Sequence, residues 1–404
     1  MTTAPGEPLL NLMSPDVLRN PYPSFDRLRA AEPVHRLPLG FVVLSRYEDV
    51  SLVLKDKRFG KTFAERMTLR NGPAIMDEPV FRSMSKWMMW VNPPDHTRLR
   101  GLVTKAFVSR RMEDMRPRIQ AQVDAIIDKM EKKDGGDLIA DFAFALPVGV
   151  ICDMLGIPQE DVPMFIGAVA NAAKLLDPVM LSRAEIDEAN GHFRNMADYF
   201  ARLFEQRRRA PGGDLTSHLL AAEEAGDKLS MEELTANMIQ LFSAGHETSI
   251  NLIGNGLLAL ARHPDQLELL RKTPSLTENA VEEMLRYDSP VQAAGRDAME
   301  DVEVGGVKLA KGEALVCLLG AANRDPAVFP DPHKLDITRA NTKHVSFGGG
   351  SHFCIGAQLA RIEAQVAFET LLRRLPNLKI QNTDAPDWRM MFVIRGMNVL
   401  PATW

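Results

Sequence analysis

The feature that most constrains the fold of this 404-residue chain is one long helical pattern between positions 230 and 264. Ser230 and Glu233 have the spacing of a capping box, which predicts the first turn of a helix, and Pro264 predicts its end. Apolar residues recur between them at spacings of three and four, so they share one face. At 1.5 Å per residue this helix is roughly 48 Å long, enough to cross a whole domain.

The rest of the chain also predicts a helical majority with a minor β portion. Residues 34–37 and 41–45 predict a small hairpin, because Pro38 and Gly40 separate two β-rich runs. Residues 47–55 predict a short helix. The β-rich parts are expected near residues 34–60, 291–339 and 378–400.

Composition excludes several classes of protein. With a net charge of −5, the chain is not expected to bind nucleic acid. No run approaches the roughly 18 apolar residues of a membrane span, and the first ten residues show no signal peptide. Cys152, Cys317 and Cys354 form no CxxC pair, which favours a reducing cytosol over a disulfide framework. A cytoplasmic monomer without membrane contact is therefore expected.

The third cysteine lies where a glycine-rich loop, residues 347–356, turns into a helix expected to reach about residue 374. Glycine lets the backbone adopt positive φ and approach a flat group closely. The N-terminus of a helix favours thiolate over thiol, and a thiolate in a tight loop suits an axial ligand of haem iron. Two other interpretations are a buried structural cysteine and a phosphate cradle, although no Lys-Ser/Thr follows the glycines.

The loop resembles the haem-binding signature of the cytochrome P450 family: Phe347, Gly348, His352, Cys354 and Gly356 stand at the family's positions. The resemblance extends over essentially the whole chain. It implies the cytochrome P450 fold, mainly α with a minor β portion, as a single haem-containing domain over residues 1–404. It also implies haem b, iron protoporphyrin IX, with Cys354 as the metal ligand, and with Phe347 and Gly356 at the cofactor.

The middle of the long helix reads Ala244-Gly245-His246-Glu247-Thr248 and is similar to the family's oxygen-activation motif. Carried over, Thr248 acts on dioxygen and Glu247 belongs to the proton route, while Ala244 and Gly245 lie at the haem. Gly245 costs about 1 kcal/mol relative to Ala in a helix, and Thr248 is expected to loosen the helix there. The alternative is ordinary helix packing with a surface Glu. The motif does not contain the Arg-Pro pair expected of peroxide-using relatives.

Four further residues match the family's ligands of the haem propionates, which need cationic or donor partners. His96 and Arg100 are four apart on a predicted helix and point the same way. Arg296 matches the usual strand arginine, and His352 is two residues before the cysteine. The alternative for any single histidine is a satisfied surface or core residue.

Ser275 and Glu278 predict a second capping box, and the helix it opens carries Glu283 and Arg286 on one face. The resemblance implies that these two residues and Arg339 form a buried ionic network that supports the cysteine loop. Three other pairs with the same spacing predict solvated helix contacts: Glu113/Arg116, Glu205/Arg208 and Glu268/Arg271.

The substrate is expected to be a hydrophobic small molecule, such as a terpenoid, steroid, polyketide or fatty compound, because the segments that match the family's pocket are mostly apolar. The alternative is that these residues are simply core. The residues concerned include Trp87, Met88, Phe242, Ala293, Met391 and Phe392.

The expected reaction is a haem-thiolate monooxygenase reaction, hydroxylation or epoxidation with one oxygen atom from O2. No flavin or iron–sulfur motif is present, so electrons from NAD(P)H are expected through a ferredoxin and its reductase. The basic patch expected for the ferredoxin comprises Arg98, Lys105, Arg110 and Arg111. The alternative for each of them alone is a solvated helix face. The alternatives are a haem-binding protein without oxygenase chemistry, and a haem-thiolate isomerase or peroxygenase. The sequence does not identify the substrate, the regiochemistry or the natural ferredoxin.

Overall fold

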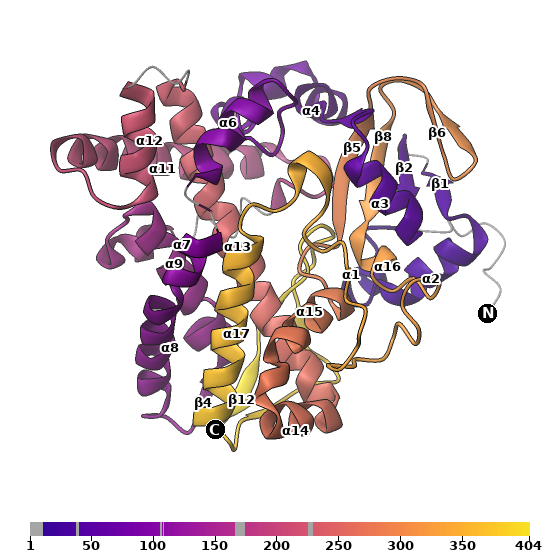
Figure 1. Ribbon diagram of the computed structural model, residues 1–404. Coiled ribbons are helices and arrows are strands. Elements are labelled where there is room, and N and C mark those ends of the chain that lie inside the picture. The colour runs from indigo at the N-terminus through magenta and orange to yellow at the C-terminus, as the bar shows by residue number, and fades with distance from the viewer. Residues whose placement is uncertain (1–10, 38–39, 106, 108, 166–173, 225–228) are drawn as a thin grey trace. The chain divides into compact units, whose positions relative to one another are not determined.

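The computed structural model describes residues 11–37, 40–105, 107, 109–165, 174–224 and 229–404. It divides into two compact units. Figure 1 labels helices and strands of both units. The first unit comprises Met1–Gly60, Gln120–Ala143 and Thr248–Trp404, and the second comprises Lys61–Ile119 and Phe144–Glu247. Among the described residues, no helix combines the length and the apolar character needed to cross a membrane.

The first unit contains a five-stranded sheet with strand order β1-β2-β8-β5-β3. Only β2 and β8 are parallel, and the other neighbours are antiparallel. The strands are β1 (Val34–Arg36), β2 (Phe41–Leu44), β3 (Phe59–Gly60), β5 (Ala293–Ala298) and β8 (Ala314–Leu318).

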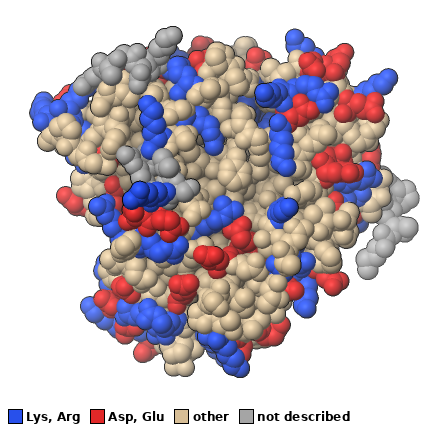
Figure 2. Space-filling view, in the orientation of Figure 1, with Lys and Arg blue, Asp and Glu red and all other residues tan. Residues whose placement is uncertain are grey.

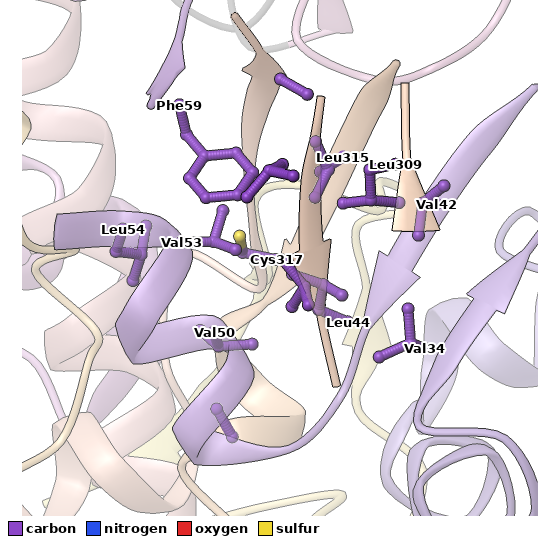
Figure 3. Packing of buried hydrophobic residues seen from close by; sticks show 14 of the residues in the cluster. Val34, Val42, Leu44, Val50, Val53, Leu54, Phe59, Leu309, Leu315 and Cys317 are labelled. Carbon is purple, nitrogen blue, oxygen red and sulfur yellow. The ribbon is translucent and has the colours of Figure 1, made fainter. Parts of the chain in front are cut away.

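One core of the first unit fills the space between this sheet and helix α3 (Tyr47–Lys55). Val50 and Val53 of the helix point toward Leu44, Leu315 and Cys317 of the strands (Figure 3). The alternation of side chains along a strand places these residues on the covered face of the sheet. The spacing of the apolar residues in 47–55 therefore places them on the one face of α3 that packs against the sheet.

The remaining elements of the first unit are mostly helices with short paired strands. Its helices are α1 (Pro15–Arg19), α2 (Tyr22–Ala31), η2 (Ile139–Ala143), α14 (Pro264–Lys272), η4 (Pro274–Leu276), α15 (Thr277–Tyr287), α16 (Leu319–Ala322), η5 (Gly350–His352) and α17 (Ala357–Arg374). Its short strands are β4 (Gly135–Asp137), β6 (Val302–Val304), β7 (Val307–Leu309), β9 (Lys379–Ile380), β10 (Asp387–Trp388), β11 (Met397–Val399) and β12 (Pro401–Thr403).

The described part of the second unit consists of helices and the turns and loops that connect them. Its elements are α4 (Phe63–Asn71), η1 (Pro73–Asp77), α5 (Pro79–Met84), α6 (Asp95–Thr104), α7 (Ser109–Asp114), α9 (Ala145–Leu155), η3 (Gln159–Phe165), α11 (Arg183–Arg209) and α12 (Leu215–Glu224). Two helices contribute residues to both units, α8 (Arg116–Met130) and α13 (Met231–Arg262).

The long helix predicted from the sequence is α13. The backbone N–H of Ser230 donates to the Glu233 carboxylate at 2.9 Å, and the Glu233 N–H donates to the Ser230 hydroxyl at 3.2 Å. The first capping box, the hairpin and the helix over residues 47–55 are confirmed.

The second predicted capping box is wrong. Ser275 lies inside the 3₁₀ turn η4, and α15 begins at Thr277 without a side-chain cap. Pro274 favours the start of a helical turn at its own position, and the Thr277 hydroxyl donates to the Pro274 carbonyl at 2.7 Å. The turn therefore begins earlier than the spacing of Ser275 and Glu278 predicts.

Candidate active site

The cysteine loop is closed by its own backbone. The Cys354 N–H donates to the Phe347 carbonyl at 2.9 Å, and the Phe353 N–H donates to the Gly350 carbonyl at 3.1 Å. Cys354 is exposed, in contrast to the buried Cys152 and Cys317. The loop therefore holds its cysteine at an accessible surface, just before the N-terminus of α17.

Two glycines of the loop adopt a backbone conformation that other residues avoid. Gly348 has φ +71 and Gly350 has φ +64. A Cβ at Gly350 would lie 2.6 Å from the backbone oxygen of Leu54, at the end of α3. Only glycine lets the loop pack this closely on α3.

A charged cluster behind the loop was not predicted. Glu282 of α15 accepts hydrogen bonds from both Nε (2.6 Å) and Nη2 (2.9 Å) of Arg361 on α17, and lies 3.2 Å from the His344 ring. These partners lower the pKa of Glu282 to about 2 although burial opposes the shift. The Arg361 guanidinium also lies over the Phe347 ring, 4.6 Å from its centre. Glu282 thus links α15 and α17 to the first residue of the loop.

The ionic network predicted from the sequence is present. Glu283 and Arg286 pair at 2.7 Å with both side chains fully buried, and Arg339 lies 3.1 Å from Glu283. Arg286 also donates to the carbonyl of Asn323 at 3.0 Å, and the Asn323 side chain accepts from the Val345 N–H at 2.8 Å. The network therefore reaches the segment that leads into the cysteine loop.

The three other Glu/Arg pairs with the same spacing do not form buried networks. Glu113 and Arg116 form an exposed pair, as predicted. In the other two cases the predicted partner is wrong, because a neighbouring cation takes the carboxylate: Arg209 pairs with Glu205, Lys272 with Glu268, and Arg208 with Glu223.

The oxygen-side motif lies on an unbroken stretch of α13. Every residue from 241 to 250 is α-helical, so the helix is continuous through the motif. Glu247 is 7% exposed, whereas Thr248 is partly exposed and Ala244 is exposed in mid-helix. Gly245 has a packing reason, since a Cβ there would lie 2.7 Å from the Ile151 side chain of α9.

His246, inside this motif, is a neutral core residue. Its Nδ1 donates to the Phe242 carbonyl at 2.6 Å, so Nε2 is left as an acceptor, and among the described residues it has no partner. Burial lowers the pKa of His246 to about 4, although the bond to Phe242 opposes the shift. The His246 imidazole is therefore uncharged at neutral pH.

Sequence reasoning missed a buried acid on the helix that follows the cysteine loop. Glu363 of α17 is 1% exposed, and within the described part of the chain neither of its carboxyl oxygens has a hydrogen-bond partner. Burial raises the pKa of Glu363 to about 8, and the nearby Ser249 hydroxyl of α13 only partly offsets the rise. An acidic residue four positions before Ala367 on an otherwise apolar helix face was the available signal.

The predicted propionate ligands are distributed over both units. In the second unit, His96 and Arg100 lie one turn apart on α6, with His96 2% exposed. In the first unit, Arg296 lies on β5 and is 4% exposed, and His352 ends the turn η5. Burial of a cation such as Arg296 costs free energy unless a negatively charged or hydrogen-bonding partner compensates for the lost water.

The predicted site residues fall into two groups by unit. The first unit holds Thr248, Arg296, Phe347, His352, Cys354 and Gly356, and the second holds His96, Arg100, Ala244, Gly245 and Glu247. Helix α13 carries the boundary between Glu247 and Thr248, so the acid and the alcohol stay adjacent on one continuous helix.

The first unit fits a haem. A thiolate-held haem needs an accessible cysteine, a loop that a flat ring can approach, and cations for its carboxylates. Cys354 is exposed, and a Cβ at Gly356 would meet nothing within 4 Å. Arg296 supplies a buried cation in the same unit. These residues fit a haem that is bound through a thiolate.

The structure alters two other predictions, the apolar pocket and the basic patch. Ala293 and Phe392 belong to a core cluster with Tyr22 and Phe25, so for them the core interpretation holds. In the basic patch, Arg98 is neutralised by Glu233 at 2.5 Å and by Asp95 at 3.1 Å. Lys105 and Arg110 are exposed, and the side chain of Arg111 lies outside the described residues. Figure 2 shows acidic and basic side chains interspersed on the face in view.

Comparison with known proteins gives a consistent result. The family model described as Cytochrome P450 matches residues 33–395. Cytochrome P450 133B1 of Xylella fastidiosa (strain 9a5c) is 43% identical over 392 residues, 97% of this chain and 98% of that protein. Vitamin D(3) 25-hydroxylase of Pseudonocardia autotrophica is 41% identical over 407 residues, 99% of this chain and 98% of that protein.

Solved structures agree in fold as well as in sequence. P450BioI, solved in complex with a hexadec-9Z-enoic acid ligated acyl carrier protein, is 38% identical with a TM-score of 0.90, over 97% of this chain and 100% of that one. A myxobacterial cytochrome P450 in complex with myristic acid is 40% identical with a TM-score of 0.90, over 97% and 98%. Because sequence and fold agree over nearly the whole length, this chain belongs to the cytochrome P450 family and is a monooxygenase of the bacterial type.

Proposed function

We propose that Cys354 holds haem b through its sulfur and that the chain hydroxylates or epoxidises a hydrophobic small molecule. The observation that carries this proposal is the exposed Cys354 thiol on a closed glycine loop. His96, Arg100, Arg296 and His352 would bind the propionates, with Phe347, Gly356, Ala244 and Gly245 at the ring. When bound, the haem supplies the iron at which O2 is reduced and one oxygen atom is transferred to the substrate.

Thr248 and Glu247 are the proposed catalytic residues. Thr248 is a partly exposed residue of α13 whose hydroxyl can act as a proton donor, and the adjacent Glu247 carboxyl can return the proton. Glu247 is itself 7% exposed, so the route it serves is shielded from bulk water. A ligand-binding haem protein without oxygenase chemistry has no use for this acid–alcohol pair.

For the substrate, we place fatty acyl chains first among the apolar classes. Two similar structures were solved with a fatty acid or a fatty acyl carrier protein, and a similar enzyme is a vitamin D(3) hydroxylase. A screen for shifts in the haem spin state with myristate, carrier-bound acyl chains and steroids ranks these classes. If no acyl chain shifts the haem spin state, fatty acyl compounds are excluded as substrates.

For the electrons, we propose a ferredoxin that receives them from NAD(P)H through a reductase and docks on Lys105 and Arg110. Charge reversal at both positions is expected to slow reduction by the ferredoxin without changing substrate affinity. Arg209, which is 80% exposed on α11, provides a matched charge-reversal control. Equal reduction rates in both variants contradict this docking surface.

We further propose that the chain works as a cytoplasmic monomer, with residues 1–404 as one domain. Neither unit is contiguous in sequence, and α13 runs through the boundary between them. Light scattering of the purified protein measures the oligomeric state.

Purification tests the central proposal. The wild-type protein is expected to be red, to give a thiolate-type spectrum with carbon monoxide after reduction, and to turn over only with reductant and O2. Cys354→Ser should lose the thiolate spectrum and the activity, whereas Cys317→Ser, a buried cysteine elsewhere in the first unit, should keep both. A colourless protein, or an unchanged spectrum in Cys354→Ser, overturns it.

A further inference from the structure

The guanidinium of Arg361, on α17, lies between a carboxylate and an aromatic ring. Its Nε and Nη2 donate to the two carboxyl oxygens of Glu282, on α15, at 2.6 and 2.9 Å. Its central carbon lies over the Phe347 ring, 4.6 Å from the ring centre. A guanidinium can hold a carboxylate through two hydrogen bonds and attract an aromatic face at the same time. Glu282 therefore fixes the positive charge of Arg361 against Phe347.

Phe347 connects this charge to the cysteine loop. The Cys354 N–H donates to the Phe347 carbonyl at 2.9 Å. The Phe347 ring also lies 6.2 Å from the Phe353 ring in an edge-to-face arrangement. The residue under the Arg361 cation is therefore the one that closes the loop onto the proposed ligand of the iron.

His344 holds the same carboxylate from a second direction. Its Nδ1 accepts from the Ser346 N–H at 3.2 Å, so the ring presents the hydrogen of Nε2 to Glu282, 3.2 Å away. Burial favours the neutral form of Glu282, but the hydrogen bonds from His344 and Arg361 outweigh it and lower the pKa of Glu282 to about 2. Glu282 and Arg361 are thus a charged pair throughout the neutral pH range.

The two charges of this pair differ in how they meet the loop. Arg361 contacts Phe347 directly, whereas Glu282 holds Arg361 from α15. Their side chains are 25% and 22% exposed, so solvent and salt screen them less than charges at an open surface. The loop therefore experiences the Arg361 cation most strongly, and the Glu282 carboxylate offsets part of that charge.

We propose that Arg361 and Glu282 are positioning residues that set the reduction potential of the haem held by Cys354. Arg361 raises the potential, and Glu282 limits the rise. The couple is the gain of one electron by ferric haem, with the electron supplied by the redox partner. A positive charge near the thiolate favours the state with one more electron and weakens electron donation by the sulfur, and both effects raise the potential. The inference rests on the haem assignment under the proposed function.

Redox titration of the purified holoprotein, with dithionite and mediators and without substrate, tests the proposal. Arg361→Met is expected to shift the reduction equilibrium at least threefold toward ferric haem, which is about 28 mV at 59 mV per tenfold change. Glu282→Gln leaves the cation uncompensated and should shift the equilibrium at least threefold toward ferrous haem. Because either substitution breaks the same contact, mere loosening of the loop moves both variants alike. Shifts of the same sign, or below threefold in both, overturn the proposal.

A second ion pair on the same helix provides the matched control. Arg374 of α17 is 21% exposed and donates from Nε to Glu131 at 3.1 Å. It lies about 20 Å farther from the cysteine loop, at 1.5 Å per residue, well beyond the screening length of about 8 Å at physiological salt. Arg374→Met and Glu131→Gln should therefore each change the equilibrium less than twofold. Shifts as large as those at Arg361 and Glu282 overturn the local role of that pair.

A charge-conserving variant separates charge from shape. Arg361→Lys keeps the cation but loses the planar fork, and its reduction equilibrium should stay within twofold of wild type. A shift as large as that of Arg361→Met overturns the electrostatic role. The carbon monoxide spectrum is recorded for every variant before titration. Equal potentials in variants that all show the thiolate spectrum overturn this inference alone, whereas a wild-type protein without haem overturns the proposed function and this inference with it.

Discussion

The Glu283 carboxylate and the Arg286 guanidinium form a two-pronged ion pair, 2.7 and 2.8 Å long, in which both side chains are 0% exposed. Arg339 adds a third contact to the same carboxylate at 3.1 Å. The pair bonds onward to the carbonyls of Asn323, Pro332 and Lys334. Its guanidinium therefore ties the segment before the cysteine loop to α15.

Glu283→Gln is expected to destabilise the protein by about 3–5 kcal/mol, because it leaves two buried guanidinium groups facing a neutral side chain. Haem incorporation should fall with it. The measurements are the urea midpoint and the haem absorbance per protein. Glu268→Gln is the matched control, since its pair with Lys272 is exposed and worth well under about 1 kcal/mol. Equal effects of the two variants contradict the structural role.

Glu363 predicts a fall in stability as pH rises. Its pKa is about 8 in the folded protein against a usual value of 4.5, so the native state holds a proton that the unfolded chain releases. Between pH 4.5 and 8 the free energy of unfolding therefore decreases with pH, by up to about 1.4 kcal/mol per pH unit from this group. Glu363→Gln should flatten that slope in urea titrations at pH 5, 6, 7 and 8.

Glu369→Gln, on the exposed face of the same helix, is the control for Glu363. It should retain the wild-type slope. The assignment of a buried neutral acid fails if the Glu363→Gln slope matches that of this control.

His246 predicts the opposite dependence at acid pH. Burial lowers its pKa from 6.5 to about 4, so the unfolded chain binds a proton that the native state refuses. Stability from this group is complete above pH 6.5 and is lost as pH falls toward 4. His246→Phe should lose less stability between pH 6.5 and 4 than wild type, whereas His218→Gln, at an exposed position on α12, should behave as wild type. An identical loss of stability between pH 6.5 and 4 in wild type and His246→Phe would falsify the assignment of a buried neutral histidine.

Thr248→Ala is expected to separate electron use from product formation. Haem content and substrate affinity should stay unchanged, while product per NAD(P)H falls several-fold and hydrogen peroxide rises, because the hydroxyl that we propose as proton donor is gone. Peroxide and product are measured in the same turnover. Thr235→Ala on the same helix, whose hydroxyl donates to the Met231 carbonyl at 2.8 Å, should remain coupled. Full coupling in Thr248→Ala removes Thr248 from the proton route.

Local patterns in the sequence predicted much of the site. The spacing of Ser230 and Glu233 identified the start of α13, and the run from Phe347 to Gly356 identified the cysteine loop. These signals are local because a helix cap and a tight loop are defined by residues within one or two turns of each other. The match to a family model over residues 33–395 agrees with this.

The sequence by itself determined which residues share a helix face and which cysteine occupies a glycine loop. Tertiary structure alone decided that Glu283 is fully buried while Glu268 is not, and that Glu363 keeps its proton. Equal spacing along a helix gives equal reach between side chains, but desolvation depends on which distant elements pack over them. Charge chemistry in this protein is therefore set by packing.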